Sequence, residues 1–108
     1  MGYRLFIDDL RDSVDPTWTI ARSSAEAIAL LLQDGCPEEI SFDHDLGGED
    51  TAMAVAKRLI DLDLDAKGAF IPPTFRFWVH SANPVGAANL QALLDRYLGL
   101  RGASADRA

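Results

Sequence analysis

The chain has 108 residues, a length that suits one domain with one hydrophobic core. Its formal net charge of -7 argues against a broad surface for duplex nucleic acid, although a local pocket can still bind a small phosphorylated ligand. No apolar run reaches the roughly 20 residues that span a bilayer, no signal-peptide pattern is visible, and Cys36 is the single cysteine. We therefore expect a cytoplasmic protein without a membrane segment or an internal disulfide.

Four short apolar segments predict β-strands, namely residues 3–7, 18–21, 40–42 and 75–79. The segment that joins the first two strands is polar and rich in turn residues. It is too short and too poor in helix formers for a full helix, so we expect a loop there.

Two helices are predicted between the later strands. The first begins with the capping box Ser23–Glu26, in which the serine caps an amide and the glutamate reaches back, and it stops at Gly35. The second follows the strand at residues 40–42, and we expect Asp50 or Thr51 to cap its first turn.

A third helix follows the last strand. Asn83 is its expected N-cap and Pro84 its first helical residue, an arrangement that proline favours because its missing N–H is not needed there. Gly99 is expected to end this helix. The sequence therefore predicts one α/β domain over residues 1–99 and a flexible tail over residues 100–108.

Strands that alternate with helices predict parallel crossovers, hence a three-layer α/β sandwich with a mostly parallel four-stranded sheet. With the strand order 2-1-3-4, the first and third strands are neighbours at the topological switch point. Ligands of such sheets bind there, beyond the carboxyl ends of the strands.

Three of the four predicted strands end in reactive side chains, which are Asp8-Asp9, Asp43-His44-Asp45 and His80-Ser81. The chain has 2 histidines, and both fall at these strand ends. Because the carboxyl ends of parallel strands meet at one edge of the sheet, we expect these groups to form one site.

Carboxylates gathered in one cleft need a counter-charge, or some of them must be protonated. A divalent hard cation such as Mg²⁺ or Mn²⁺ fits oxygen ligands, and the candidate ligands are Asp8, Asp9, Asp43 and Asp45. His44 and His80 can instead act as a base and acid pair in phosphoester cleavage. The sequence does not determine which histidine is the base and which is the acid.

Phosphate recognition has candidate residues at the same edge. The helix that starts at Asn83 points free amides toward it, and Gly86 in the first turn allows close approach of a phosphate oxygen. Arg11 and Arg22 are candidate phosphate clamps.

Each of these features also has an ordinary structural explanation. Asp8-Asp9 can begin a turn, His44 can be a solvated loop residue, and His80 can be a hydrogen-bonded core residue. Ser81 and Asn83 can be helix caps, and the arginines can be surface residues. Three aromatic residues are expected in the core or on the sheet face rather than as stacking platforms for bases, namely Trp18, Phe77 and Trp78.

The motifs resemble the receiver domains of response regulators. Asp8 and Asp9 match the acidic pair of receivers, Asp43 matches the phosphorylated aspartate, and Ser81 matches the hydroxyl residue after the fourth strand. The chain departs from receivers in four ways: the first helix is a loop, a fifth strand is missing, neither Lys57 nor Lys67 takes the place of the conserved lysine, and His44 and His80 are additional.

The sequence resembles a divergent branch of this superfamily, the cyclic-phosphate processing receiver-like domain, more closely than it resembles the receivers themselves. Its motif Leu-Phe-(Ile/Leu)-Asp-Asp reads here as Leu5–Asp9, Asp-His-Asp-Leu-Gly as Asp43–Gly47, and His-Ser-x-Asn-Pro-x-Gly as His80–Gly86. This resemblance implies a minimal receiver-like, flavodoxin-like fold and the handling of a cyclic phosphate, on a nucleotide or an RNA end.

The resulting hypothesis is a metal-dependent phosphoesterase that acts on a cyclic phosphate. Its catalytic residues would be His44, His80 and Asp43, and its substrate-binding residues would be Arg11, Ser81, Asn83 and Gly86. The alternative is a non-catalytic receiver-like module that binds a phosphorylated ligand or a protein partner. The acidic composition disfavours a long RNA footprint, and the sequence leaves the oligomeric state open.

Overall fold

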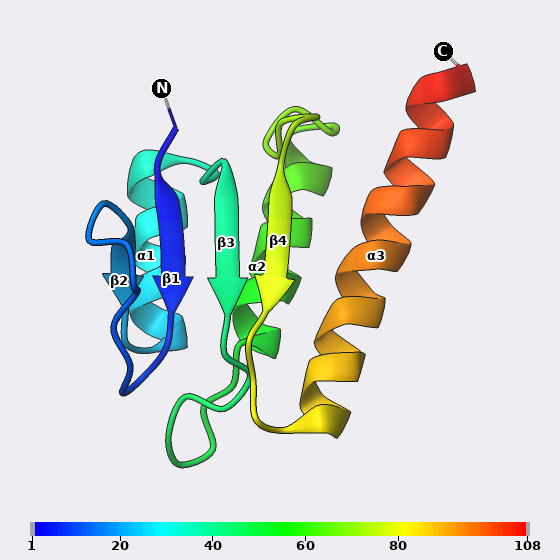
Figure 1. Ribbon diagram of the computed structural model, residues 1–108. Helices are drawn as coiled ribbons and strands as arrows, with labels where there is room; N and C mark the ends of the chain where they lie inside the picture. The colour runs from blue at the N-terminus through cyan, green and yellow to red at the C-terminus, as the bar shows by residue number, and fades with distance from the viewer. Residues whose placement is uncertain (1, 108) are drawn as a thin grey trace.

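The computed structural model describes residues 2–107, with side chains described up to residue 101. These residues form four strands and three helices, labelled in Figure 1, with the bounds β1 Arg4–Ile7, β2 Thr19–Ala21, α1 Ser24–Asp34, β3 Glu39–Phe42, α2 Met53–Asp65, β4 Arg76–Val79 and α3 Pro84–Arg107. No helix in this part of the chain combines the length and the apolar character that a membrane crossing requires.

The four strands form one parallel sheet in the order β2-β1-β3-β4, which confirms the predicted topology. β1 and β3 lie side by side at the centre, with Ile7 opposite Phe42 and Phe42 opposite Val79. The carboxyl ends of these three strands are therefore level with one another. The residues that follow them share one edge of the sheet.

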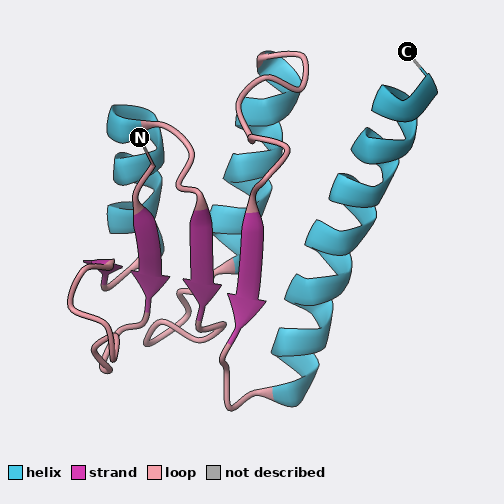
Figure 2. Cartoon of the chain, turned by 45° about the horizontal axis from the view of Figure 1, so that its top comes forward, coloured by secondary structure: helices cyan, strands magenta, loops and turns pink. Residues whose placement is uncertain are grey.

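The helices lie on one face of the sheet, so the expected three-layer arrangement is corrected to two layers among the described residues. α1 and α2 lie behind the strands in Figures 1 and 2, α2 contacts α1 and α3, and α3 runs beside β4. The connection from β1 to β2, where a receiver has its first helix, is a loop. Its apolar side chains Leu10 and Val14 are exposed, so it has no apolar stripe to bury and no reason to form a covering helix.

The core lies between the sheet and this single helical layer. Alternate residues of β1 and β3 point into it, including Leu5 and Ile7 and then Ile40 and Phe42. The helices contribute fully buried aliphatic side chains, namely Ala27, Leu31, Val55, Ala56, Leu59, Leu90 and Leu94. The other side chains of each strand, including Phe6 and Ser41, therefore point to the face that no described helix covers.

The predicted start and end of α1 are confirmed. The Ser23 hydroxyl accepts a hydrogen bond from the Glu26 amide, and the chain leaves the helix at Gly35 with a φ of 82°. The prediction that Asp50 or Thr51 caps α2 is wrong, because no side chain caps this helix. Asp50 instead accepts hydrogen bonds from the amide and hydroxyl of Ser24, because this places its charge at the positive end of α1.

The start of α3 is also confirmed, since the Asn83 Oδ1 accepts a hydrogen bond of 3.0 Å from the Gly86 amide. The prediction that α3 ends at Gly99 is wrong, because the helix continues to Arg107. Arg101, in the segment predicted as a tail, binds the Asp63 carboxylate and the Ile71 carbonyl oxygen. These contacts outweigh the roughly 1 kcal/mol that glycine costs in a helix interior. Ala108 lies outside the described residues.

Candidate active site

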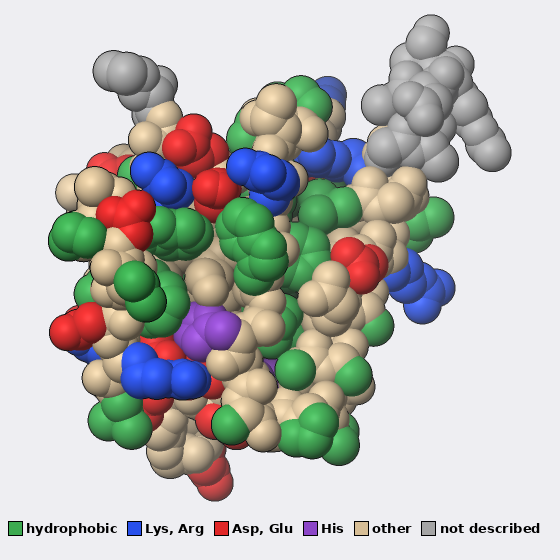
Figure 3. Space-filling view, viewed as in Figure 1, with side chains coloured by type: hydrophobic (Ala, Val, Ile, Leu, Met, Phe, Trp, Pro, Cys, Tyr) green, Lys and Arg blue, Asp and Glu red, His purple; other side chains and the backbone are tan. Residues whose placement is uncertain are grey.

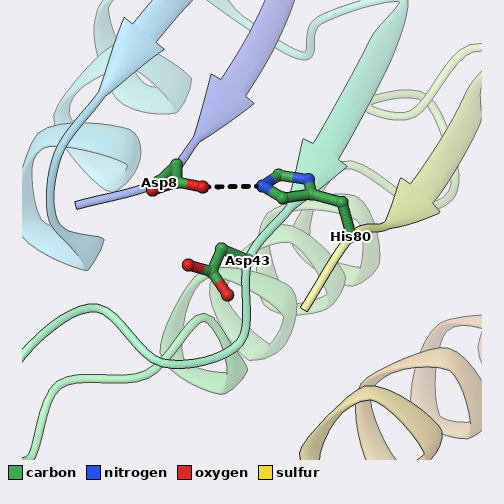
Figure 4. A group of neighbouring side chains, drawn as sticks. All are labelled: Asp8, Asp43 and His80. Atoms are coloured by element: carbon green, nitrogen blue, oxygen red, sulfur yellow. Dashed lines mark hydrogen bonds and ion pairs between the residues drawn. The ribbon is translucent and has the colours of Figure 1, made fainter. Parts of the chain in front are cut away.

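Asp8, Asp43 and His80 form a compact group at the carboxyl ends of β1, β3 and β4 (Figure 4). Each follows directly after the last residue of its strand, and these last residues (Ile7, Phe42 and Val79) lie opposite one another in the sheet. Each of the three side chains points to the face that no described helix covers. Candidate ligand atoms of the three side chains lie within 4.8 Å of one another. The sheet register thus assembles the group without any contribution from a loop conformation.

Asp8 is the most firmly held member of the group. Its side chain is 1% exposed, and its Oδ1 accepts hydrogen bonds from the amides of Leu10 and Arg11 at 2.9 and 2.8 Å. Its Oδ2 lies 3.0 Å from the Nε of Arg11 and 3.1 Å from the Nε2 of His80. Burial alone would raise the pKa of Asp8, but the two amides, the imidazole and the guanidinium together lower it. Asp8 is therefore held in its charged form.

Asp43 lies beside Asp8 with fewer partners. Burial, followed by the nearby charge of Asp8, raises the pKa of Asp43, and the interactions with His80, Arg11 and Ser81 only partly offset this. The Nη2 of Arg11 is 3.8 Å from its Oδ2. Two adjacent carboxylates with a single nearby guanidinium leave negative charge that a proton or a metal cation can neutralise.

The imidazole of His80 is fixed on three sides. Its Nε2 faces Asp8, its Nδ1 is 2.7 Å from the Ser41 hydroxyl oxygen, and its ring stacks on Phe6 at 4.6 Å with an interplanar angle of 6°. Sequence reasoning missed both Ser41 and Phe6. The signal was present in the strand alternation, because Phe6 and Ser41 precede Asp8 and Asp43 by two residues and so share their side of the sheet.

A second group lies next to the first turn of α3. The His44 Nδ1 is 2.8 Å from the Asp45 Oδ1, and Asn83 donates from Nδ2 to the Asp45 Oδ2 at 3.2 Å. The hydrogen bond from His44, and then that from Asn83, lowers the pKa of Asp45. The His44 ring lies against Gly86, since a Cβ added there would come within 2.5 Å of its Nδ1. His44 thus packs against α3, whereas His80 lies beside Asp8 and Asp43.

The structure distributes the remaining candidates around these two groups. Asp9 lies near Gly47, where an added Cβ would be 3.4 Å from its Oδ2. The Ser81 hydroxyl accepts a hydrogen bond from the Asn83 amide, and its hydrogen bond to Asp43 offsets a small part of the rise in the pKa of that carboxyl. Arg22 donates to the carbonyl oxygens of Asp8 and Arg11 and pairs with Asp12, so it fixes the loop after β1.

Only part of the predicted metal-ligand set comes together. Asp8 and Asp43 offer carboxylate oxygens and His80 a ring nitrogen, a donor set that suits Mn²⁺ and, through its oxygens, Mg²⁺. Asp9 and Asp45 do not belong to this group in the part of the chain that is described. Arg11 now supplies the positive charge between the two aspartates, so a bound cation requires its side chain to move.

Comparison with known proteins adds one finding to this geometry. The sequence model of the cyclic-phosphate processing receiver domain matches residues 3–96, which span all four strands and most of α3. The chain belongs to this family. In searches of curated proteins and of solved structures, no match reached significance. The three motifs of the cyclic-phosphate processing receiver domain supply both groups described above, from Asp8 in the first motif to Gly86 in the last.

Proposed function

We propose that this cyclic-phosphate processing receiver domain is a phosphoesterase that opens the cyclic phosphate of a nucleotide or of an RNA terminus. The observation that carries the proposal is the row of Asp8, Asp43 and His80 at one edge of the sheet. It brings two carboxylates and an oriented imidazole to the place where ligands of parallel sheets bind. Family membership supplies the substrate class.

Asp8 and Asp43 are assigned as ligands of a divalent cation, Mg²⁺ or Mn²⁺. Such a cation, when bound, withdraws electrons from the phosphoryl group and offsets the charge that develops during attack. Arg11 would then be released from the two aspartates. Its guanidinium is suited to bind the phosphate oxygens of the substrate, together with the side chains of Ser81 and Asn83 and the amide of Gly86.

His80 is assigned as the general acid and His44 as the general base. His80 has its Nε2 at 3.1 Å from the Asp8 Oδ2, beside the site assigned to the phosphate, and its ring is fixed by Ser41 and Phe6, so it is assigned to give a proton to the leaving ester oxygen. His44 is oriented by Asp45, as a catalytic base is by its partner. Water attacks phosphorus and loses a proton to His44, one ring P–O bond breaks, and the product is a phosphomonoester.

A binding module without turnover is the second candidate. It is favoured by the contacts of Arg11 with both Asp8 and Asp43, because this guanidinium neutralises part of the charge of the site without a metal. Such a module would bind a phosphorylated ligand and release it unchanged. On binding, the Arg11 side chain would leave the two aspartates and contact the phosphate.

Phosphorus NMR on a nucleoside 2′,3′-cyclic phosphate separates the two candidates. We expect Mn²⁺-dependent loss of the cyclic-phosphate signal, and the position of the new monoester signal identifies the bond that opens. The His80→Gln variant should lose turnover by roughly 100-fold or more, as expected for removal of a general acid. An unchanged cyclic signal with saturable ligand binding would support the binding module instead.

The metal assignment has a test that does not depend on turnover. We expect Mn²⁺ to raise the melting temperature of the unmodified protein, and the Asp43→Asn variant to lose this shift. Asp95→Asn, a matched change on the exposed side of α3, should keep the full shift. Equal shifts in all three proteins would show that the cation binds elsewhere.

A further inference from the structure

The uncovered face of the sheet carries a groove beside the candidate active site. The groove has a volume of about 350 Å³ and is lined by Phe6, Ser13, Val14, Asp15, Trp18, Ser41 and Trp78. Figure 3 views this face and shows hydrophobic side chains gathered on it beside a histidine. The volume lies within the range of small-molecule sites.

The groove is continuous with the site through two shared residues. Phe6 lines the groove and stacks on the ring of His80, and Ser41 lines the groove and binds the Nδ1 of His80. Phe6 and Ser41 lie two residues before Asp8 and Asp43, so the two levels of the sheet are roughly 6.6 Å apart. The groove and the aspartates are therefore adjacent, with the ring of His80 between them, and a ligand held at the aspartates reaches the groove past this ring.

The groove offers flat aromatic surfaces. Trp18 and Trp78 approach to 6.4 Å between ring centroids with an interplanar angle of 59°, so they form two inclined walls. Trp78 is 46% exposed although it lies in a strand of the sheet. The guanidinium groups of Arg4 and Arg76 lie over the Trp18 and Trp78 rings, at 5.6 and 5.7 Å from the ring centroids, so a planar ring can stack only on the part of each indole that its arginine leaves uncovered. Ser13, Ser41 and Asp15 offer polar atoms beside them.

We propose that this groove binds the nucleobase of the substrate, which makes the substrate class a nucleoside cyclic phosphate or a single nucleotide at an RNA end. The proposal rests on the proposed function, since that places the phosphate at Asp8, Asp43 and His80. The base stacks against Trp18 and Trp78, and the ribose lies over the ring of His80, which itself stacks on Phe6 and binds Ser41. This proposal departs from the expectation, drawn from the sequence, that Trp18 and Trp78 lie in the core or on the sheet face and are not stacking platforms for bases.

Intrinsic fluorescence provides a direct test, because Trp18 and Trp78 are the 2 tryptophans of the chain and both line the groove. We expect cytidine or adenosine 2′,3′-cyclic phosphate to quench the emission in a saturable manner. Glycerol 1,2-cyclic phosphate, which has the same phosphate ring without a base, should leave the emission nearly unchanged. Equal responses to both compounds would overturn the proposal.

A variant series tests the same contact independently of quenching. Trp78→Leu should weaken nucleotide binding measured by calorimetry by roughly tenfold, as expected for loss of a stacked base, and should leave glycerol 1,2-cyclic phosphate unaffected. Leu32→Ala, which truncates an exposed apolar side chain of α1 outside the groove, should change neither affinity.

Failure of this inference and failure of the proposed function give different results. If the nucleotide and the glycerol compound are hydrolysed with equal kcat/KM in the unmodified and Trp78→Leu proteins, the function stands and the base site is overturned. If the nucleotide quenches fluorescence but is never hydrolysed, the base site is supported and the phosphoesterase is overturned. Emission that changes with protein concentration alone, together with a doubled mass in ultracentrifugation, would assign the groove to a second copy and overturn the proposal.

Discussion

Gly86 determines where His44 can lie. The imidazole packs directly on the glycine Cα, at a distance where any Cβ would come within 2.5 Å of the Nδ1. A side chain at this position would therefore push the ring away from Asp45. The glycine has a positional role for His44, in addition to the phosphate contact proposed for its amide.

We expect Gly86→Ala to lower the free energy of unfolding by about 1–3 kcal/mol, the usual cost of an overpacked site. Urea denaturation measures this loss, and nitrogen-15 NMR of the His44 ring should show that its hydrogen bond to Asp45 is broken. Intact His44 resonances together with full stability would contradict this assignment.

Gly99→Ala is the matched control for this experiment. Gly99 also lies in α3, but an added Cβ there meets nothing within 4 Å. Because alanine favours a helix more than glycine does, this change should stabilise the protein by about 0.5–1 kcal/mol. Opposite signs at two glycines of one helix would separate the packing effect from helix propensity.

At the scale of the elements, Asp63 joins α2, α3 and the loop before β4. Its carboxylate is fully buried and accepts hydrogen bonds from the amides of Phe70 and Ile71, the Tyr97 hydroxyl and the Arg101 guanidinium. Burial alone would raise its pKa, but the Ile71 amide, Tyr97 and Arg101 outweigh burial and lower it. The hydrogen bond to Asp63, after burial, raises the pKa of Tyr97 to about 12.

This network predicts a specific dependence of stability on pH. Because the pKa of Asp63 is lower in the folded state, its stabilisation is complete above the unfolded-state pKa of about 3.9 and is lost as the pH falls toward the lowered folded-state value. Asp63→Asn should therefore show a smaller loss of stability than the unmodified protein between about pH 5 and pH 2. At pH 7 the variant should be less stable by about 1–3 kcal/mol. Asp61→Asn, at an exposed position of α2, should leave the urea denaturation curves unchanged at each pH.

The same residue shows where prediction from sequence stops. Strand ends, Ser23, Asn83 and Gly35 carry local signals, so the four strands, both ends of α1 and the start of α3 follow from spacing and capping chemistry. Asp63 stands among alternating acids and leucines at the end of α2. Its spacing from Leu59 places it on the buried stripe of the helix, but its partners Tyr97 and Arg101 lie in another helix and are not indicated by any local pattern. The continuation of α3 past Gly99 depends on the tertiary contacts of Arg101, which no local signal contains.

The candidate site was predictable to a similar extent. The carboxyl edge of the sheet and its reactive residues followed from strand ends alone, and the register confirms that Asp8, Asp43 and His80 are level. The division into two groups follows from side-chain direction, because consecutive residues leave a strand on opposite sides and His44 therefore turns toward α3. The place of Arg11 between the aspartates depends on the loop after β1 and could not be read from spacing.

At the scale of the whole molecule, the sheet has two kinds of strand. β1 and β3 have hydrogen-bonded neighbours on both sides, whereas β2 and β4 are paired on one side only. We expect hydrogen exchange to be slowest at the amides of β1 and β3, because their exposure requires global unfolding, and faster at β2. Mass-resolved exchange measures this order, and protection of β2 equal to that of β1 would contradict it.

The concentration of function on one side of three strands limits how this protein can vary. Asp8, Asp43 and His80, with Phe6, Ser41 and Trp78 one level below, all depend on the same two-residue repeat. An insertion of one residue in β3 would move each following side chain to the opposite face of the sheet. Asp43 would then point into the hydrophobic core, and Phe42 would point toward solvent. Substitutions can therefore alter the chemistry of this sheet, and insertions can lengthen its loops. Insertions or deletions of single residues within the strands would disrupt both the site and the core.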